Sequence, residues 1–153
     1  MKVLKCLGIS FGVIIGGIFV ALAILGSFVP ETSVYLGRQV PSKYMEEINT
    51  LGLVADDEQI KYFYTDALFD IKEGMYFITD KNLVLYSNMW EEPKTIISFS
   101  DISSIEVDYD DSFLNDSMVL VGVLDYEIEF PLSSEHARDR KFIEYLLTKT
   151  QIE

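Results

Sequence analysis

The sequence predicts a mainly β fold: a seven-stranded antiparallel barrel capped by a C-terminal helix, preceded by a short helix and an N-terminal transmembrane helix. Three observations support this. Residues 6–30 carry no formal charge, apolar residues alternate with polar ones from Gln59 onward, and the chain closes with an amphipathic helical pattern. We therefore divide the chain into a transmembrane anchor at 1–30, a linker with a short amphipathic helix at 31–56, and a barrel domain at 57–153.

The uncharged run from Cys6 to Pro30 is 25 residues long. A helix rises about 1.5 Å per residue, so this run exceeds the roughly 30 Å thickness of the hydrocarbon core. A cleaved signal peptide is the alternative, because Lys2 and Lys5 precede the run and Ala21-Leu22-Ala23 resembles a cleavage site. The run is longer than a signal peptide needs, which favours an uncleaved single-pass anchor. The two lysines favour a cytoplasmic N-terminus and an extracytoplasmic C-terminal domain.

Glycines recur every fourth residue within the anchor, at Gly8, Gly12 and Gly16. Small residues at this spacing lie on one helix face and let two helices approach closely. They form a candidate helix-association face, although glycine is also common in membrane helices generally.

A short helix is expected after the linker. In the segment "PSKYMEEINTLGLV", Ser42 is a candidate N-cap and Gly52 can supply the left-handed residue that ends the helix. Tyr44, Ile48 and Leu51 follow the helical spacing. We expect this helix to dock on the barrel.

Seven strands follow, separated by short turns. They are expected in the segments "IKYFYT", "MYFIT", "NLVLY", "TIISF", "IEVDY", "SMVLVGVL" and "YEIEFPL". Asn82 is expected to take the left-handed conformation in the turn between the second and third strands. The spacing of Phe99, Ile102 and Ile105 predicts one helical turn or a bulge between the fourth and fifth strands.

The C-terminal segment "EHARDRKFIEYLLTK" predicts the closing helix, capped by Ser133 or Ser134. Its expected apolar stripe consists of Phe142, Ile143, Leu146 and Leu147.

The segments "YFITDKNLVLYS", "TIISFSDISSIEV" and "FPLSSEHARDRKFIEYL" together resemble bacterial members of the pleckstrin-homology-like (PH-like) family, over roughly Asp57 to Lys149. The resemblance implies a PH-like barrel and a membrane-anchored interaction module. Lipid-binding members carry basic residues around the first hairpin loop. Here the corresponding loop, "TDALFDIKEG", has one lysine against three acidic residues, so anionic headgroup binding is not expected.

The acidic net charge of the chain after Pro30 argues against two further kinds of partner. All 25 acidic residues lie after Pro30 with ten lysines and arginines, so this part carries a net charge of −15. Nucleic acids require clustered basic residues and are excluded. Anionic lipid surfaces are disfavoured for the same reason.

No catalytic, cofactor or metal set is distinguishable. His136 is the only histidine, and we expect it at the surface in the first turn of the last helix. The acidic segment "DYDDSFLNDS" lacks the glycine and glutamate of an EF-hand loop, so we read it as a solvated loop rather than a metal or hydrolase site. Glu127 and Glu129 are assigned to the exposed face of a strand.

The remaining candidate contact is Met89 with Trp90, in an expected loop beside two glutamates. The alternative is that this loop folds over and buries the indole. The predicted function is a non-enzymatic, membrane-anchored interaction or scaffold module in the bacterial envelope, with a protein partner or self-association. The alternative is a barrel that binds a small ligand or lipid at the membrane surface.

Overall fold

The computed structural model describes residues 16–18, 20, 33–112, 115–150 and 152. The chain separates into two compact units, residues 1–30 and residues 31–153. Of the first unit, the described residues 16–18 and 20 are helical. Among all described residues, no helix is both long and apolar enough to cross a membrane. Most of the predicted anchor, including Gly8 and Gly12, lies outside the described residues.

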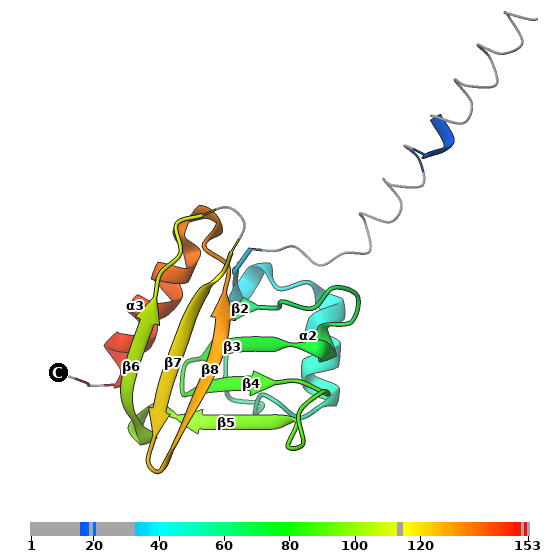
Figure 1. Ribbon diagram of the computed structural model, residues 1–153. Helices are drawn as coiled ribbons and strands as arrows, with labels where there is room; N and C mark the ends of the chain where they lie inside the picture. The colour runs from blue at the N-terminus through cyan, green and yellow to red at the C-terminus, as the bar shows by residue number, and fades with distance from the viewer. Residues whose placement is uncertain (1–15, 19, 21–32, 113–114, 151, 153) are drawn as a thin grey trace, which may run out of the picture. The chain divides into compact units, whose positions relative to one another are not determined.

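The second unit contains two antiparallel sheets (Figure 1). Five strands form the first sheet in sequence order: β1 (Tyr35–Leu36), β2 (Ile60–Tyr64), β3 (Met75–Thr79), β4 (Asn82–Tyr86) and β5 (Lys94–Ser98). Three strands form the second sheet: β6 (Ile102–Asp108), β7 (Ser117–Val123) and β8 (Tyr126–Leu132). The seven predicted strands are confirmed as β2 to β8. Strand β1 was not predicted, because two residues are too few to show alternation.

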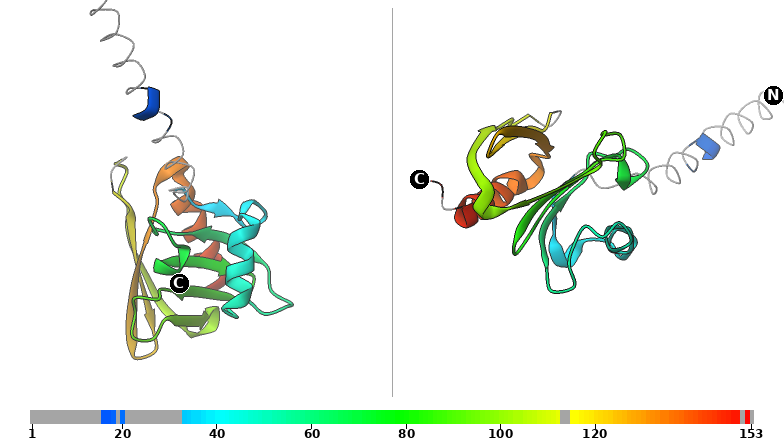
Figure 2. Two further views of the ribbon diagram at one scale, coloured as in Figure 1. Left: turned by 90° about the vertical axis from the view of Figure 1, so that its right-hand side faces the viewer. Right: turned by 90° about the horizontal axis from the view of Figure 1, so that it is seen from below.

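The helix α3 (Arg138–Thr150) packs against the core between the two sheets. The helix α2 (Ser42–Thr50) covers the other face of the first sheet, which points away from the second sheet (Figure 2). Four 3-10 turns complete the unit: η1 (Gly37–Gln39), η2 (Ile71–Glu73), η3 (Phe99–Asp101) and η4 (Glu135–Ala137). The turn η3 joins β5 to β6, which confirms the helical turn predicted from the spacing of Phe99, Ile102 and Ile105.

The strands β3 and β4 are buried on both faces. In β3, Tyr76 and Ile78 join the cluster between the sheets and α3, whereas Met75 and Phe77 join a second cluster under α2. The register pairs Phe77 with Val84, so the faces match across the strands. This explains why these strands read as continuous apolar runs, since a strand covered on both sides needs apolar residues at every position.

The helix α2 ends as predicted but begins differently. Gly52 has a φ of +61°, and hydrogen bonds run from Gly52 N to Asn49 O and from Leu53 N to Ile48 O, which is a Schellman ending. Ser42, expected as the N-cap, is instead the first helical residue, and Pro41 occupies the cap without a side-chain hydrogen bond. Pro41 is suited to this position because it has no backbone N–H to leave unpaired.

The start of the last helix also differs from the expectation. His136 and Ala137 have φ values of +59° and +51°, so the continuous helix begins only at Arg138. His136 lies in η4 and is exposed. Leu147, placed by its spacing on the apolar stripe, is 44% exposed, because the stripe is wider than the surface α3 has to cover. Phe142, Ile143 and Leu146 are fully buried, as predicted.

The turn between β3 and β4 does not use a left-handed Asn82. The described residues with positive φ other than glycine are Leu124, His136 and Ala137. Instead the Thr79 hydroxyl accepts hydrogen bonds from the backbone N–H groups of Lys81 and Asn82, at 3.0 and 2.8 Å. A threonine oxygen closing its own turn removes the need for a strained residue.

Candidate functional site

The interior between the two sheets is filled by side chains. Its members are at most 8% exposed, and Tyr76 stacks on Phe130 at 5.7 Å between ring centroids. Tightly packed interiors of this kind leave no room for a ligand. The ligand-binding alternative, which places a molecule at the barrel mouth, stays a prediction.

Two buried tyrosines and two carboxylates meet where β2 ends and β3 begins. The Tyr64 hydroxyl donates to Asp116 Oδ2 at 2.6 Å, and the Tyr76 hydroxyl donates to Asp66 Oδ2 at 3.2 Å. Burial, followed by the neighbouring carboxylates, raises the pKa of both phenols well above the usual range. Burial likewise raises the pKa of Asp66. The first bond ties the end of β2 to the loop before β7, and the second ties β3 to the loop after β2.

Three large apolar side chains are exposed at this same end of the first sheet. Leu68 and Phe69 are 56% and 71% exposed in the loop 65–74, and Met89 is 80% exposed in the loop 87–93. Both loops follow strands that run in the same direction, β2 and β4, so they leave the sheet at the same end of the strands. We call Leu68, Phe69 and Met89 the apolar loop end.

Hydrogen bonds hold the two loops against each other. Asn88 N donates to Lys72 O at 2.8 Å, and Ser87 Oγ donates to Glu73 O at 2.6 Å. Ser87 N also donates to Pro93 O at 2.9 Å and closes the second loop on itself. A surface held in this way loses little conformational entropy when a partner binds.

The predicted contact pair Met89 and Trp90 separates in the structure. Met89 is exposed, whereas Trp90 is half-buried and packs against the core cluster between the sheets. The backbone N–H of Trp90 donates to Ser87 O at 3.2 Å and closes this turn of the loop. Trp90 therefore fixes the loop that presents Met89, in line with the alternative that the loop folds over the indole.

Leu68 and Phe69 were missed as contact residues. The sequence around them was weighed only for its charges, yet two adjacent large apolar residues between Asp66 and Asp70 are unusual in an exposed loop. The rim of the apolar loop end is acidic, with Asp70, Glu91 and Glu92 exposed. Lys72 already pairs with Asp70 at 3.5 Å and with Glu47 at 3.7 Å.

The first described residues of the second unit enter at this end. Strand β1 runs antiparallel to β2 with Tyr35 opposite Phe63, which places Ser33 and Val34 beside the last residues of β2. Arg138 Nη1 donates to Val34 O at 2.8 Å and secures this entry. Ser33 follows the apolar run 6–30 by only two intervening residues.

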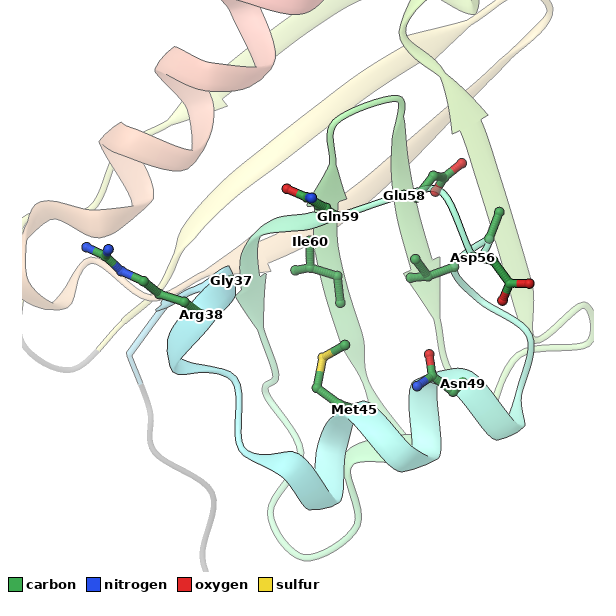
Figure 3. A pocket seen from close by; sticks show the side chains of 10 residues that line it. Gly37, Arg38, Met45, Asn49, Asp56, Glu58, Gln59 and Ile60 are labelled. Carbon is green, nitrogen blue, oxygen red and sulfur yellow. The ribbon is translucent and has the colours of Figure 1, made fainter.

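A groove of about 660 Å³ lies on the other side of the first sheet, between α2 and the segment that leads into β2 (Figure 3). Met45 on α2 and Ile60 on β2 point toward each other across it, whereas Arg38 points away. The wall is held by the β3–β4 turn, since Asp80 Oδ1 accepts from Gln59 N at 2.8 Å and Lys81 pairs with Asp57. Gly37 is required at its edge, because a Cβ there would overlap the Ile60 carbonyl oxygen.

The carboxylates of the acidic loop are bound within the loop and by α3. Asp110 accepts from Ser112 N at 2.6 Å and from Asn115 Nδ2 at 3.2 Å, which lowers its pKa, and Asp111 pairs with Arg140 at 2.8 Å. Within the described part of the chain, which excludes residues 113 and 114, no group of three histidine, cysteine or acidic side chains could hold a metal ion. Glu127 and Glu129 are exposed on β8, as expected.

The candidate helix-association face has only one described member. Gly16 is helical and exposed, and nothing described lies within 4 Å of a Cβ placed on it. Association through Gly8, Gly12 and Gly16 stays a prediction.

Comparison with known proteins supports the fold. Neither a family model nor a curated protein matches the sequence. A solved structure of a DUF1696 family protein with a pleckstrin-homology domain from Shewanella loihica PV-4 matches 78% of this chain and 99% of its own, with a TM-score of 0.55 and 13% identity. A pleckstrin-homology domain from Shewanella amazonensis SB2B matches 71% of this chain and 86% of its own, with a TM-score of 0.50 and 13% identity. The second unit therefore has a PH-like fold, as its sequence resemblance implied.

Proposed function

We propose that this protein is a non-enzymatic, membrane-anchored PH-like interaction or scaffold module of the bacterial envelope, and that it contacts a protein partner through the apolar loop end. The observation that carries the proposal is the exposure of Leu68, Phe69 and Met89 on two loops that are hydrogen-bonded together.

The composition of the apolar loop end fits a protein contact. Phenylalanine and methionine are enriched at the centres of interfaces, and charged residues surround such centres as a rim. A lipid headgroup fits less well, because Asp70, Glu91 and Glu92 would be repelled by anionic lipids. The rim therefore favours a partner that brings an apolar anchor and basic residues.

The proposed anchor would determine where this contact occurs. The apolar run 6–30 is long enough to span a bilayer, and the chain enters the second unit beside β2, at the edge from which both loops project. With only Glu31 and Thr32 between Pro30 and Ser33, an anchored chain would tether residues 33–153 to the membrane by a short connection. The partner would then be another membrane protein or a protein bound at the membrane surface.

Crosslinking from the loop tests the proposal. A photoreactive phenylalanine analogue at Phe69 of the full chain, in native membranes, should yield a discrete protein adduct. The double variant Phe69→Ser/Met89→Ser should fail to co-purify that protein. The control is Leu147→Ser, which removes an exposed apolar side chain from α3, away from the two loops, and should retain the partner. Co-purification of that protein with the double variant would contradict the proposal.

Vesicle flotation separates the lipid alternative from a protein contact. Residues 31–153 form a unit with its own core and can be tested without the anchor. We expect no flotation with neutral vesicles or with vesicles containing phosphatidylglycerol. Flotation that Phe69→Ser abolishes would assign the apolar loop end to lipid instead.

A small-ligand site is the second candidate function, and the groove beside α2 is the observation that favours it. Its lining mixes Met45 and Ile60 with Asp56 and Glu58, so a ligand there would have an apolar body and a cationic group. Thermal-shift screening of residues 31–153 with small amines would detect such a ligand. A shift that Glu58→Gln removes would support this site.

A further inference from the structure

The outer face of the second sheet has no covering element among the described residues. Alternate residues of β6, β7 and β8 point away from the core there, and the central strand contributes Met118, Leu120 and Gly122. The register places Leu120 between Glu106 on β6 and Glu129 on β8. We call this surface the acidic sheet face.

The middle of the acidic sheet face is apolar and hollowed. A depression of about 290 Å³ is lined by Met118 and Leu120 together with Glu106, Asp108 and Glu129. A second depression of about 370 Å³ continues along the same strands, past Gly122 to the β7–β8 turn. A Cβ on Gly122 would overlap the Ser104 hydroxyl, so glycine keeps the floor low at this point.

An exposed apolar end completes the surface. Leu124, at the β7–β8 turn, is 80% exposed with a φ of +50°, and Tyr126 beside it is also exposed. A non-glycine residue in the left-handed region is strained, and a large apolar one exposed to water gains nothing in return. Contact with a partner would bury this side chain.

The charge on this surface has one sign. From Thr95 to Ala137 the sequence contains ten acidic residues and no lysine or arginine. Among the described residues, the ion pair formed by this stretch joins Asp111 to Arg140 in the loop, and Glu106, Asp108, Glu127 and Glu129 form none. The acidic residues on the strands are therefore free to meet external cations.

The spacing of the two acidic rows matches the width of a helix. Rows on β6 and β8 are two strand spacings apart, or about 10 Å. An α-helix with its side chains is about 10–12 Å wide. Seven-residue strands extend for roughly 24 Å, which is the length of about 16 helical residues. A helix lying along β7 would place an apolar stripe on Met118 and Leu120 and basic residues on both rows.

We propose that the acidic sheet face binds a cationic amphipathic helix of a protein partner. A second copy of this chain does not fit, because two units of charge −15 repel each other. Nucleic acid and anionic lipid are excluded by the same sign of charge. This binding surface is separate from the apolar loop end, so either can fail without the other.

The test uses the full chain in phosphatidylcholine nanodiscs and a fluorescent 16-residue peptide with a leucine stripe between two rows of lysine. The control peptide has the same composition in scrambled order, and empty nanodiscs give the background. Fluorescence anisotropy should show binding of the striped peptide that weakens at high salt. The variant Glu106→Gln/Glu129→Gln should weaken binding by about tenfold.

A matched variant distinguishes this surface from general charge attraction. Glu46→Gln/Glu144→Gln removes the same charge from two exposed positions on α2 and α3 and should change affinity by less than about twofold. Met118→Ser should also weaken the striped peptide more than the scrambled one. Absence of binding, equal losses in the two charge variants, equal binding of the scrambled peptide, or hydrogen-exchange protection confined to the loops 65–74 and 87–93 would each overturn the proposal.

Discussion

At the scale of single residues, the buried tyrosines show how this fold treats polar groups. Tyr64 and Tyr76 stack at 6.2 Å between ring centroids, and each donates its hydroxyl to an aspartate. Burial disfavours the phenolate form, and the neighbouring carboxylates disfavour it further. The folded state therefore favours the protonated form of both phenols.

This arrangement makes the free energy of unfolding sensitive to alkaline pH. The pKa of each phenol is raised in the folded state above the unfolded value of about 10, so the stabilisation is complete below pH ~10 and is lost as the pH rises beyond it. We expect Tyr64→Phe/Tyr76→Phe to be less stable at neutral pH by roughly 2 kcal/mol, from two lost hydrogen bonds. Its stability should fall less steeply above pH 10.

Urea denaturation between pH 8 and 11.5, followed by circular dichroism, measures this difference. Tyr126→Phe is the matched control, since that ring is exposed on β8. A double variant that loses stability as steeply as the unmodified chain would show that other groups control alkaline unfolding.

At the scale of elements, α2 is a structural part of the domain and not an appendage. It covers Met75, Phe77 and Val84 on the outer face of the first sheet, and Phe63 packs between Phe77 and Tyr44, with ring centroids 5.9 Å from each. Removing the helix would expose several large side chains at once. Buried apolar area of this kind stabilises by about 25 cal/mol per Å².

Two aliphatic residues on the two helices give a direct comparison. Ile48 on α2 is fully buried, whereas Leu147 on α3 is 44% exposed. We expect Ile48→Ala to lower the free energy of unfolding by about 2–4 kcal/mol, because it leaves a cavity. Leu147→Ala should cost less than about 1 kcal/mol. Urea denaturation of residues 31–153 measures both, and equal costs would mean that α2 contributes little.

At the scale of the whole molecule, the orientation of the proposed membrane anchor would decide which partners can be reached. Lys2 and Lys5 precede the apolar run, while Arg38 and Lys43 lie farther beyond its other end. For the proposed anchor, the positive-inside rule predicts an N-terminus in the cytoplasm and residues 31–153 outside it.

A C-terminal reporter on the full chain measures this orientation. Alkaline phosphatase fused after Glu153 should be active, because it folds only outside the cytoplasm, and a green fluorescent protein fusion should stay dark. Loss of Lys2 and Lys5 should reduce phosphatase activity. A fluorescent fusion in the unmodified chain would reverse the proposed topology and restrict the partners to the cytoplasmic side.

Sequence alone determined the elements that have a clear period and a recognisable end. The alternation in "YEIEFPL" identified β8, the three-residue spacing from Phe99 indicated a helical turn or a bulge where η3 lies, and Gly52 identified the end of α2. Each of these signals is local, because backbone conformation and the alternation of faces are set within a few residues. The PH-like fold was implied by the resemblance of several of these segments to that family.

Only the tertiary structure decided which apolar residues are left in contact with water. Leu147 has the spacing of a core residue and is exposed, while Trp90 lies in a loop and is half-buried. Leu68 and Phe69 join Met89 at one end of the sheet because the two loops that carry them follow β2 and β4, which run in the same direction. Burial depends on what each face meets after folding, and periodicity within one element does not contain that information. The apolar loop end and the acidic sheet face therefore became visible only once the sheets were assembled.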